Sequence, residues 1–154
     1  MPAPLRDEIK QSKGFTSLGE EAHLTLIRTA DLISHEVTSL LKEAADVSPV
    51  QYNVLRILRG AGEAGHTCSA IAERLITRDP DVTRIIDRML KRGLVQRSRD
   101  PNDRRVVRVV LTDAGRSLVD QLDEPIRSHH RKRFKGVSKE RLRALIDVLD
   151  EIRG

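Results

Sequence analysis

The segment from residue 79 to residue 111 limits the fold most narrowly, because its periodicity changes from helical to extended across a single glycine, Gly93. Before that glycine, five apolar side chains recur at helical spacing on one face: Val82, Ile85, Ile86, Met89 and Leu90. Asp79-Pro80 is a typical helix start, since proline at the first helical position loses no hydrogen bond. After the glycine, residues 94–99 and 105–111 have strand composition and flank Asp-Pro-Asn-Asp, a typical turn sequence. The sequence therefore predicts a helix followed directly by a β-hairpin.

Five further helices are predicted, each preceded by a serine or threonine whose side chain can cap the first turn: Ser17, Ser48, Thr67, Thr112 and Ser138. The first extends over about residues 18–45, roughly 40 Å at 1.5 Å per residue. A domain of this size cannot cover such a length, so we expect this helix to pack against another subunit. Pro125 lies inside the helix that follows Thr112 and is expected to bend or break it. The predicted fold class is mainly α with one small β-hairpin.

The basic charge of the chain is concentrated in residues 78–108. This segment holds ten lysines and arginines against five aspartates, and its net charge of +5 equals that of the whole 154-residue chain. A patch of this kind attracts a polyanion, most simply nucleic acid. The alternative is a charged face that only keeps the protein in solution, but such a face does not require so uneven a distribution.

Other features restrict the class of protein. No apolar run approaches the roughly 18 residues of a membrane-spanning helix, and the first residues lack the apolar stretch of a signal peptide. Cys68 is the single cysteine, so no disulfide forms within the chain. There is no tryptophan, and phenylalanine and tyrosine are rare, so the core must be aliphatic. We expect a soluble cytoplasmic protein.

Two short helices followed by a β-hairpin are typical of a winged helix-turn-helix, in which the second helix enters the major groove of DNA. Residues 78–92 suit this role, because their apolar face can anchor the helix while their polar face points outward. Arg84 can form two hydrogen bonds with guanine, and Thr83 can contact a thymine methyl group or a phosphate. Arg78 precedes the helix and can contact phosphate, and Pro80 lies on the outward face.

Three charged residues of this helix allow more than one interpretation. Asp81 repels phosphate, so it either accepts a hydrogen bond from cytosine or holds Arg84 at the i, i+3 spacing, and we favour the second role. Asp87 is spaced to pair with Arg84 or Lys91 on the same face. Arg88 is either a DNA contact or a solvated charge.

The hairpin carries arginines at its tip as well as on its stem. Its turn places Arg104 and Arg105 away from any core, where a projecting arginine fits the narrow, negative minor groove of A·T-rich DNA. Asp103 can orient the guanidinium of Arg105, and Arg104 is expected to contact phosphate. Alternate residues of the second strand are expected to face inward: Val107, Val109 and Leu111. The stem arginines either contact phosphate or keep an edge strand soluble: Arg97, Arg99 and Arg108.

Three segments carry a resemblance to a known family: SAIAERL (69–75), DVTRIIDRMLKRGLVQR (81–97) and DPNDRRVVRVVLTDAG (100–115). Within the last, Asp103-Arg104-Arg105 followed by Leu111-Thr112 is quite a specific pattern. On these residues the chain resembles the multiple antibiotic resistance regulator (MarR) family of bacterial transcription factors.

The resemblance implies a homodimer that binds double-stranded DNA through a winged helix-turn-helix in each subunit. It divides the chain into an N-terminal arm (1–16), a helical dimerisation region (17–47 and 112–154) and a DNA-binding domain (48–111). It also implies residue roles: Arg105 in the minor groove with Asp103 as its partner, Thr83 and Arg84 on the recognition helix, and Thr67 and Ser69 at the DNA backbone.

Regulators of this family often bind a small aromatic or anionic molecule between the dimer helices and the DNA-binding domain. The ligand shifts the spacing of the recognition helices and so releases DNA. By position, such a site lies near four residues that also suit ordinary packing: His23, Ile27, Tyr52 and Leu55. Repression is the commoner outcome in the family, so the resemblance implies a ligand-responsive repressor that needs no cofactor.

Other functions receive less support from the motifs. Cys68 at the start of a short helix would suit a redox-responsive regulator, although a small, chemically unreactive residue is the simpler interpretation. No HExxH or paired CxxC spacing appears, and neither a nucleophile elbow nor a glycine-rich phosphate loop, so we expect neither a metal site nor an enzyme. A winged helix that binds only proteins is the remaining alternative, and it would lack the steep salt dependence of DNA binding.

Overall fold

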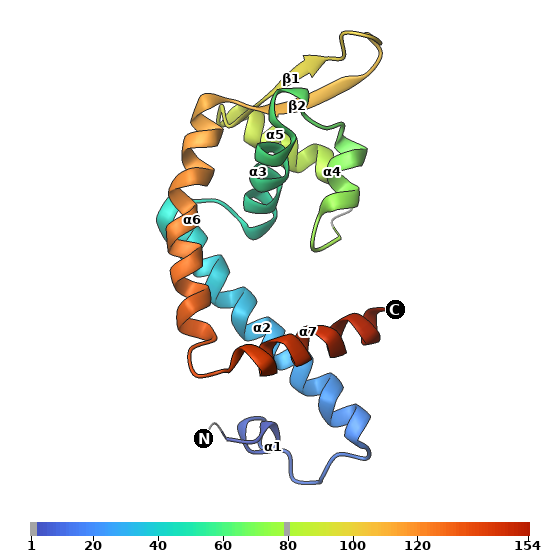
Figure 1. The fold of residues 1–154 in the computed structure, drawn as a ribbon, viewed down its shortest axis with the longest axis vertical. Helices are drawn as coiled ribbons and strands as arrows, with labels where there is room; N and C mark the ends of the chain where they lie inside the picture. The colour runs from blue at the N-terminus through green and yellow to red at the C-terminus, as the bar shows by residue number, and fades with distance from the viewer. Residues whose placement is uncertain (1–2, 79–80) are drawn as a thin grey trace. The chain divides into compact units, whose positions relative to one another are not determined.

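The computed structural model describes residues 3–78 and 81–154, and it confirms a mainly helical chain with one antiparallel two-stranded sheet (Figure 1). The described residues form two compact units, one up to Pro49 and one from Val50 onward. Residues 3–16, predicted as an arm, contain a short helix, α1 (Leu5–Glu8). Within the described ranges, no helix combines the length and the apolar character that a membrane span requires.

The first unit is dominated by helix α2 (Leu18–Ala45), whose predicted range is confirmed. Ser17 caps it, because its hydroxyl accepts a hydrogen bond from the backbone N–H of Glu20 at 3.1 Å. The Glu20 carboxylate in turn accepts hydrogen bonds from the N–H and the hydroxyl of Thr16. These reciprocal bonds fix the first turn of α2.

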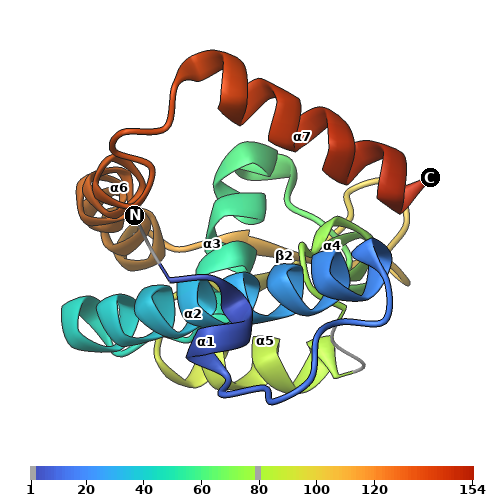
Figure 2. The same ribbon diagram turned by 90° about the horizontal axis from the view of Figure 1, so that it is seen from below.

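The second unit contains the remaining elements in this order: α3 (Pro49–Ala61), the 3-10 turn η1 (Gly62–Ala64), α4 (Cys68–Arg74), α5 (Val82–Lys91), β1 (Val95–Arg99), β2 (Val107–Leu111), α6 (Asp113–Arg133) and α7 (Lys139–Arg153). Its core is aliphatic, as predicted, and includes Leu55, Leu58, Ile71, Ile86 and Met89, all fully buried. Helix α4 packs against α5, and α5 against β1. Figure 2 shows α6 nearly end-on while α7 crosses the view, so the last two helices run in different directions.

The base of the hairpin is fixed by the start of α6. Thr112 caps this helix by accepting a hydrogen bond from the N–H of Gly115 at 3.0 Å, and its hydroxyl donates to the carbonyl of Gly93 at 2.6 Å. A Cβ atom at Gly115 would lie 2.0 Å from the carbonyl oxygen of Leu94, so this position requires glycine. The α6 N-terminus therefore lies directly against the turn between α5 and β1.

Helix α5 begins later than the sequence predicted. Its first residue is Val82, and Asp81 caps it by accepting a hydrogen bond from the backbone N–H of Arg84 at 3.1 Å. A residue that caps a helix with its side chain has a non-helical backbone itself, so the helix begins after Asp81. The structural role favoured for Asp81 is thus directed at the backbone of Arg84. Asp79 and Pro80 lie outside the described residues, so the role of Pro80 stays a prediction.

Helix α6 continues through Pro125 without a break, although the sequence predicted that this proline would either bend or break the helix. The proline removes one backbone donor. Val119, Leu122 and Ile126 are nevertheless buried on both sides of it, and this packing stabilises the helix. The alternative of two separate helices is therefore wrong.

The inward face of β2 also differs from the strict alternation that was predicted. Val107 is 44% exposed, whereas the adjacent residues Val109 and Val110 are both buried. The outer end of the hairpin extends beyond the core, so the side chain of Val107 has no apolar residues to pack against. At the base, a Cβ atom on Gly65 would lie 2.6 Å from Cγ1 of Val110, so the glycine backbone covers the second face of the strand there.

Candidate nucleic-acid interface

Helix α5 has one buried apolar face and one exposed polar face, as predicted. Its buried residues are Val82, Ile85, Ile86 and Met89. The exposed side chains include Thr83, Arg84 and Arg88, and Arg78 is exposed just before the helix. None of these three arginines forms an ion pair with another residue in the described part of the chain. Their positive charges are therefore available to an external anion.

Helix α4 presents two hydroxyl groups at its start. Thr67 caps the helix by accepting a hydrogen bond from the N–H of Ala70 at 3.2 Å, and its Oγ1 lies 3.1 Å from Oγ of Ser69. Ser69 is exposed and Thr67 is half-buried. The structure thus explains Thr67 as a cap, while DNA-backbone contacts by the two residues stay predictions.

The tip of the hairpin is a loop from Asp100 to Val106 that backbone hydrogen bonds close at two levels. The N–H of Asp100 donates to the carbonyl of Val106 at 3.0 Å, and the N–H of Val106 donates to the carbonyl of Asp103 at 2.9 Å. Arg104 and Arg105 occupy the centre of the inner turn, and both are exposed. The loop therefore carries two adjacent cations at its end.

The sequence predicted that Asp103 contacts the guanidinium of Arg105, but in the structure it contacts the backbone of Arg105 instead. Its Oδ1 accepts a hydrogen bond from the N–H of Arg105 at 3.0 Å. This bond is typical of aspartate in a turn, where the short side chain reaches the N–H two residues later. Within the described residues, the side chains of Arg104 and Arg105 form no ion pair. Asp103 therefore shapes the turn and leaves the Arg105 guanidinium exposed.

Two stem arginines are paired with aspartates, which the sequence did not predict. Arg97 of β1 pairs with Asp87 of α5 at 2.7 Å, so Asp87 does not pair with the helical neighbours proposed for it. Arg108 of β2 pairs with Asp100 at 2.7 Å. Both pairs join residues at least eight positions apart, and sequence spacing on one element cannot reveal them. Of the three stem arginines, Arg97 and Arg108 are thus neutralised by aspartates, whereas Arg99 and the two tip arginines form no ion pair with the described residues.

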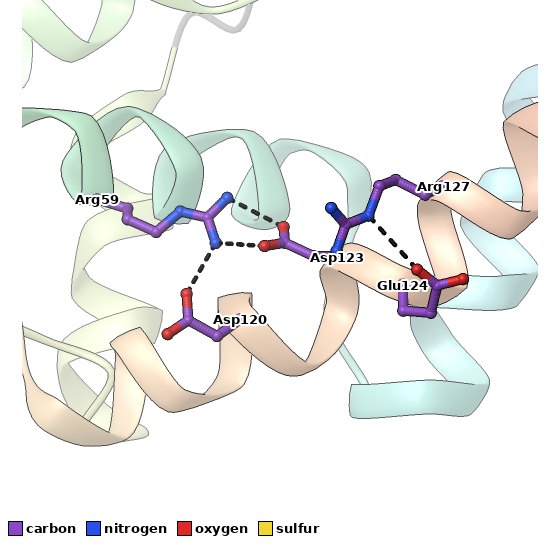
Figure 3. A network of polar contacts seen from close by, with 5 residues as sticks. All are labelled: Arg59, Asp120, Asp123, Glu124 and Arg127. Carbon is purple, nitrogen blue, oxygen red and sulfur yellow. Dashed lines mark hydrogen bonds and ion pairs between the residues drawn. The ribbon is translucent and has the colours of Figure 1, made fainter.

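A further polar network joins α3 to α6 (Figure 3). Arg59 donates to both carboxylate oxygens of Asp123 at 2.8 and 3.0 Å, and to Asp120 at 2.8 Å. The hydrogen bonds with Asp123, followed by the one with Asp120, raise the pKa of Arg59. The contact with Arg59 in turn lowers the pKa of Asp123. Sequence reasoning missed the network, although Asp120 and Asp123 stand at the i, i+3 spacing of one helix face.

His66 adds a third short extended segment beside the hairpin. Its N–H donates to the carbonyl of Val109 at 3.0 Å, and its carbonyl accepts from the N–H of Val109 at 2.8 Å. Burial, followed by the positive charges of Arg74 and Arg108, lowers the pKa of the imidazole. The neutral form of the His66 imidazole is therefore favoured at this position.

The residues predicted near an effector site fall in both units. His23 and Ile27 are exposed on α2, whereas Leu55 is fully buried on α3 and Tyr52 is nearly so. Burial raises the pKa of the Tyr52 hydroxyl. These four positions stay a prediction of a ligand site.

Cys68 is half-buried at the first position of α4. The described residues contain no group of three or more histidine, cysteine, aspartate and glutamate side chains placed to hold a metal ion. A redox role for the thiol stays an untested alternative.

This fold and this interface define a winged helix-turn-helix DNA-binding protein. The MarR family model matches residues 47–107. The MarR transcription factor from Planctomyces limnophilus is 40% identical, with 89% of this chain and 98% of that chain covered and a TM-score of 0.66. The chain therefore belongs to the MarR family of transcriptional regulators, which are not enzymes.

Two further relatives indicate the range of the family. The transcriptional repressor IacR of Pseudomonas putida is 28% identical over 127 residues, which are 82% of this chain and 74% of IacR. CouR of Rhodococcus jostii RHA1, solved with bound p-coumaroyl-CoA, is 25% identical, with 90% and 95% of the two chains covered and a TM-score of 0.76.

Proposed function

We propose that this regulator is a homodimeric, ligand-responsive repressor that binds a pseudo-palindromic operator. In each subunit α5 enters the major groove, where Arg84 reads a base and Thr83 contacts a thymine methyl group or a phosphate. The wing enters the flanking minor groove with Arg105. The observation that carries the proposal is the charge distribution of the hairpin, in which the stem arginines Arg97 and Arg108 are paired while the tip arginines are not.

The apolar surface of two helices supports the dimer. Within α2, all of which the structure describes, Leu41 is the only buried residue, while Leu26, Ile27 and Leu32 are exposed. Helix α7 contains no buried residue at all over its fully described length, and its exposed apolar side chains include Leu145, Ile146 and Ile152. Surfaces of this kind are characteristic of subunit interfaces. The predicted dimerisation region, 17–47 with 112–154, therefore supplies the contact.

An effector of aromatic or anionic character fits the same proposal. CouR binds the CoA thioester of an aromatic acid, which combines both properties. Release of DNA requires that the effector bind the DNA-incompetent spacing of the recognition helices better than the competent one. His23, Ile27, Tyr52 and Leu55 remain the positions proposed for this site, and IacR supports repression as the outcome.

The proposal is tested by selecting bound sequences from a random DNA pool with the full-length protein. We expect an inverted repeat whose half-site centres are about one helical turn apart. Binding should weaken steeply between 50 and 200 mM salt, since several phosphates are neutralised. An enriched sequence without two-fold symmetry would contradict the dimeric mode. Failure to enrich any sequence would favour a module that binds proteins.

The repressor role and the effector need separate measurements. A reporter gene placed behind the selected operator should be less active when the regulator is expressed. Small aromatic acids and their CoA thioesters are then screened for release of labelled operator DNA. Higher reporter activity on expression would indicate an activator, with the DNA-binding mode unchanged.

A further inference from the structure

We propose that Asp100 is the positioning residue of the wing, and that its carboxylate holds the loop in the one shape that places Arg105 in the minor groove. The inference rests on the proposed function, because it assumes that the wing reads this groove. It assigns the role to a residue that does not itself contact DNA.

The carboxylate of Asp100 connects the loop to the opposite strand. Oδ1 accepts hydrogen bonds from the N–H groups of Asn102 at 2.8 Å and Asp103 at 3.3 Å. Oδ2 accepts a hydrogen bond from Nε of Arg108 at 2.7 Å, across the hairpin. One side chain therefore fixes the first half of the loop and anchors it to β2.

No apolar packing can replace these bonds. All side chains from Pro101 to Arg105 are exposed, and Val106 is half-buried. The Asp100 side chain is 14% exposed, although it lies in the same loop. The hydrogen bond from Arg108, followed by that from Asn102, lowers the pKa of Asp100 and so favours its ionised form. The shape of the tip therefore depends on polar contacts with this residue.

Asp103 has the more limited role at the end of this chain of contacts. Its carboxylate accepts a hydrogen bond from the N–H of Arg105, while its own N–H donates to Asp100. Asp100 thus sets the orientation of the inner turn, and the inner turn sets the position of Arg105. Arg108 is engaged by Asp100 and should contribute little direct phosphate contact.

The test measures minor-groove reading separately from overall affinity. Three operators are compared that carry A·T, G·C or inosine·C pairs where the wing binds. Inosine lacks the 2-amino group of guanine, so inosine·C resembles A·T in the minor groove but G·C in the major groove. We expect the wild type to prefer the A·T and inosine·C operators over the G·C operator by about tenfold.

Asp100→Ala should reduce this preference to less than about threefold, because the loop loses all three bonds. Asp100→Asn keeps an acceptor for the backbone N–H groups and should give an intermediate preference. Glu124→Gln is the matched control, since it removes one negative charge from an exposed ion pair on α6 and should leave the preference unchanged. Circular dichroism melting of each variant verifies that the fold is retained.

Arg108→Met tests the anchor from the opposite strand. If Asp100 acts as proposed, this variant also lowers the preference for A·T and inosine·C. If Arg108 instead binds phosphate directly, all three operators weaken equally and the salt slope falls by about one, which contradicts the proposal. Asp100→Ala with an undiminished preference overturns it outright. A wild type that does not distinguish inosine·C from G·C would refute minor-groove reading, and the inference would fail with it.

Discussion

Arg97 of β1 and Asp87 of α5 form an ion pair, with 2.7 Å between Nη2 and Oδ1, that joins the wing to the helix proposed to enter the major groove. Both side chains are about half exposed. Ion pairs of this kind contribute about 0 to 1 kcal/mol to stability. The pair therefore has more influence on charge than on folding, because it neutralises one cation of the proposed DNA-binding surface and one aspartate of α5.

Asp87→Asn should strengthen DNA binding without a measurable change in thermal stability. The substitution removes a negative charge from α5 and releases Arg97 toward phosphate. We expect the salt slope measured by fluorescence anisotropy to steepen by about one, as for one additional phosphate contact. Arg97→Met is the control, and it should leave the slope unchanged. A slope in Asp87→Asn equal to that of the wild type would show that Arg97 cannot reach the DNA.

Arg105→Ala should keep the fold and weaken operator binding by about 5- to 100-fold, the range for one specific arginine contact. The guanidinium is exposed at the tip of the hairpin, so its removal disturbs no packing. Affinity is measured on the selected operator, with Arg99→Ala on the stem as a control that should change it much less. Equal binding by wild type and Arg105→Ala would refute the assignment of the wing arginine.

Arg84→Ala should relax the base preference at one position in each half-site. Arg84 is exposed on α5 and can form two hydrogen bonds with guanine, worth about 1 to 3 kcal/mol of discrimination. Repeating the selection from random DNA with the variant measures this directly. An unaltered consensus would mean that Arg84 contacts only the DNA backbone.

Local chemistry allowed much of this fold to be predicted. Ser17, Thr67, Thr112 and Ser138 each cap the helix that was predicted to follow. A cap depends on residues within one turn, and such contacts can be recognised in sequence. The long-range pairs of Arg59, Arg97 and Arg108 could not, since they depend on how separate elements approach one another. Val107 was misassigned because alternation alone does not reveal where a hairpin leaves the core.

Replacing Ile146 and Ile152 of α7 together by aspartate should yield a folded protein that no longer dimerises. In the single chain these side chains are 57% and 68% exposed, so their replacement leaves the packing within a subunit intact. Analytical ultracentrifugation measures the mass, and Arg143→Asp on the same helix controls for added negative charge. A double variant with the mass of a dimer would show that α7 is not part of the interface.

Arg59→Met should lower the free energy of unfolding by about 1 kcal/mol, which is below the roughly 1.5 to 3 kcal/mol of a hydrogen bond to a charged group because the network is partly exposed to solvent. The contact with Arg59 lowers the pKa of Asp123 below its ordinary value of 3.8. The contribution of Asp123 is therefore complete above that value and is lost as the pH falls through the lowered pKa.

The difference between wild type and Arg59→Met should thus be constant from pH 5 to 8 and shrink below about pH 4. Urea unfolding at one fixed protein concentration measures it, because an oligomer makes apparent stability depend on concentration. Arg116→Met, which alters an exposed arginine on α6, should show neither effect. A difference that persists unchanged to pH 2 would mean that Arg59 stabilises the fold through the packing of its aliphatic chain and not through Asp123.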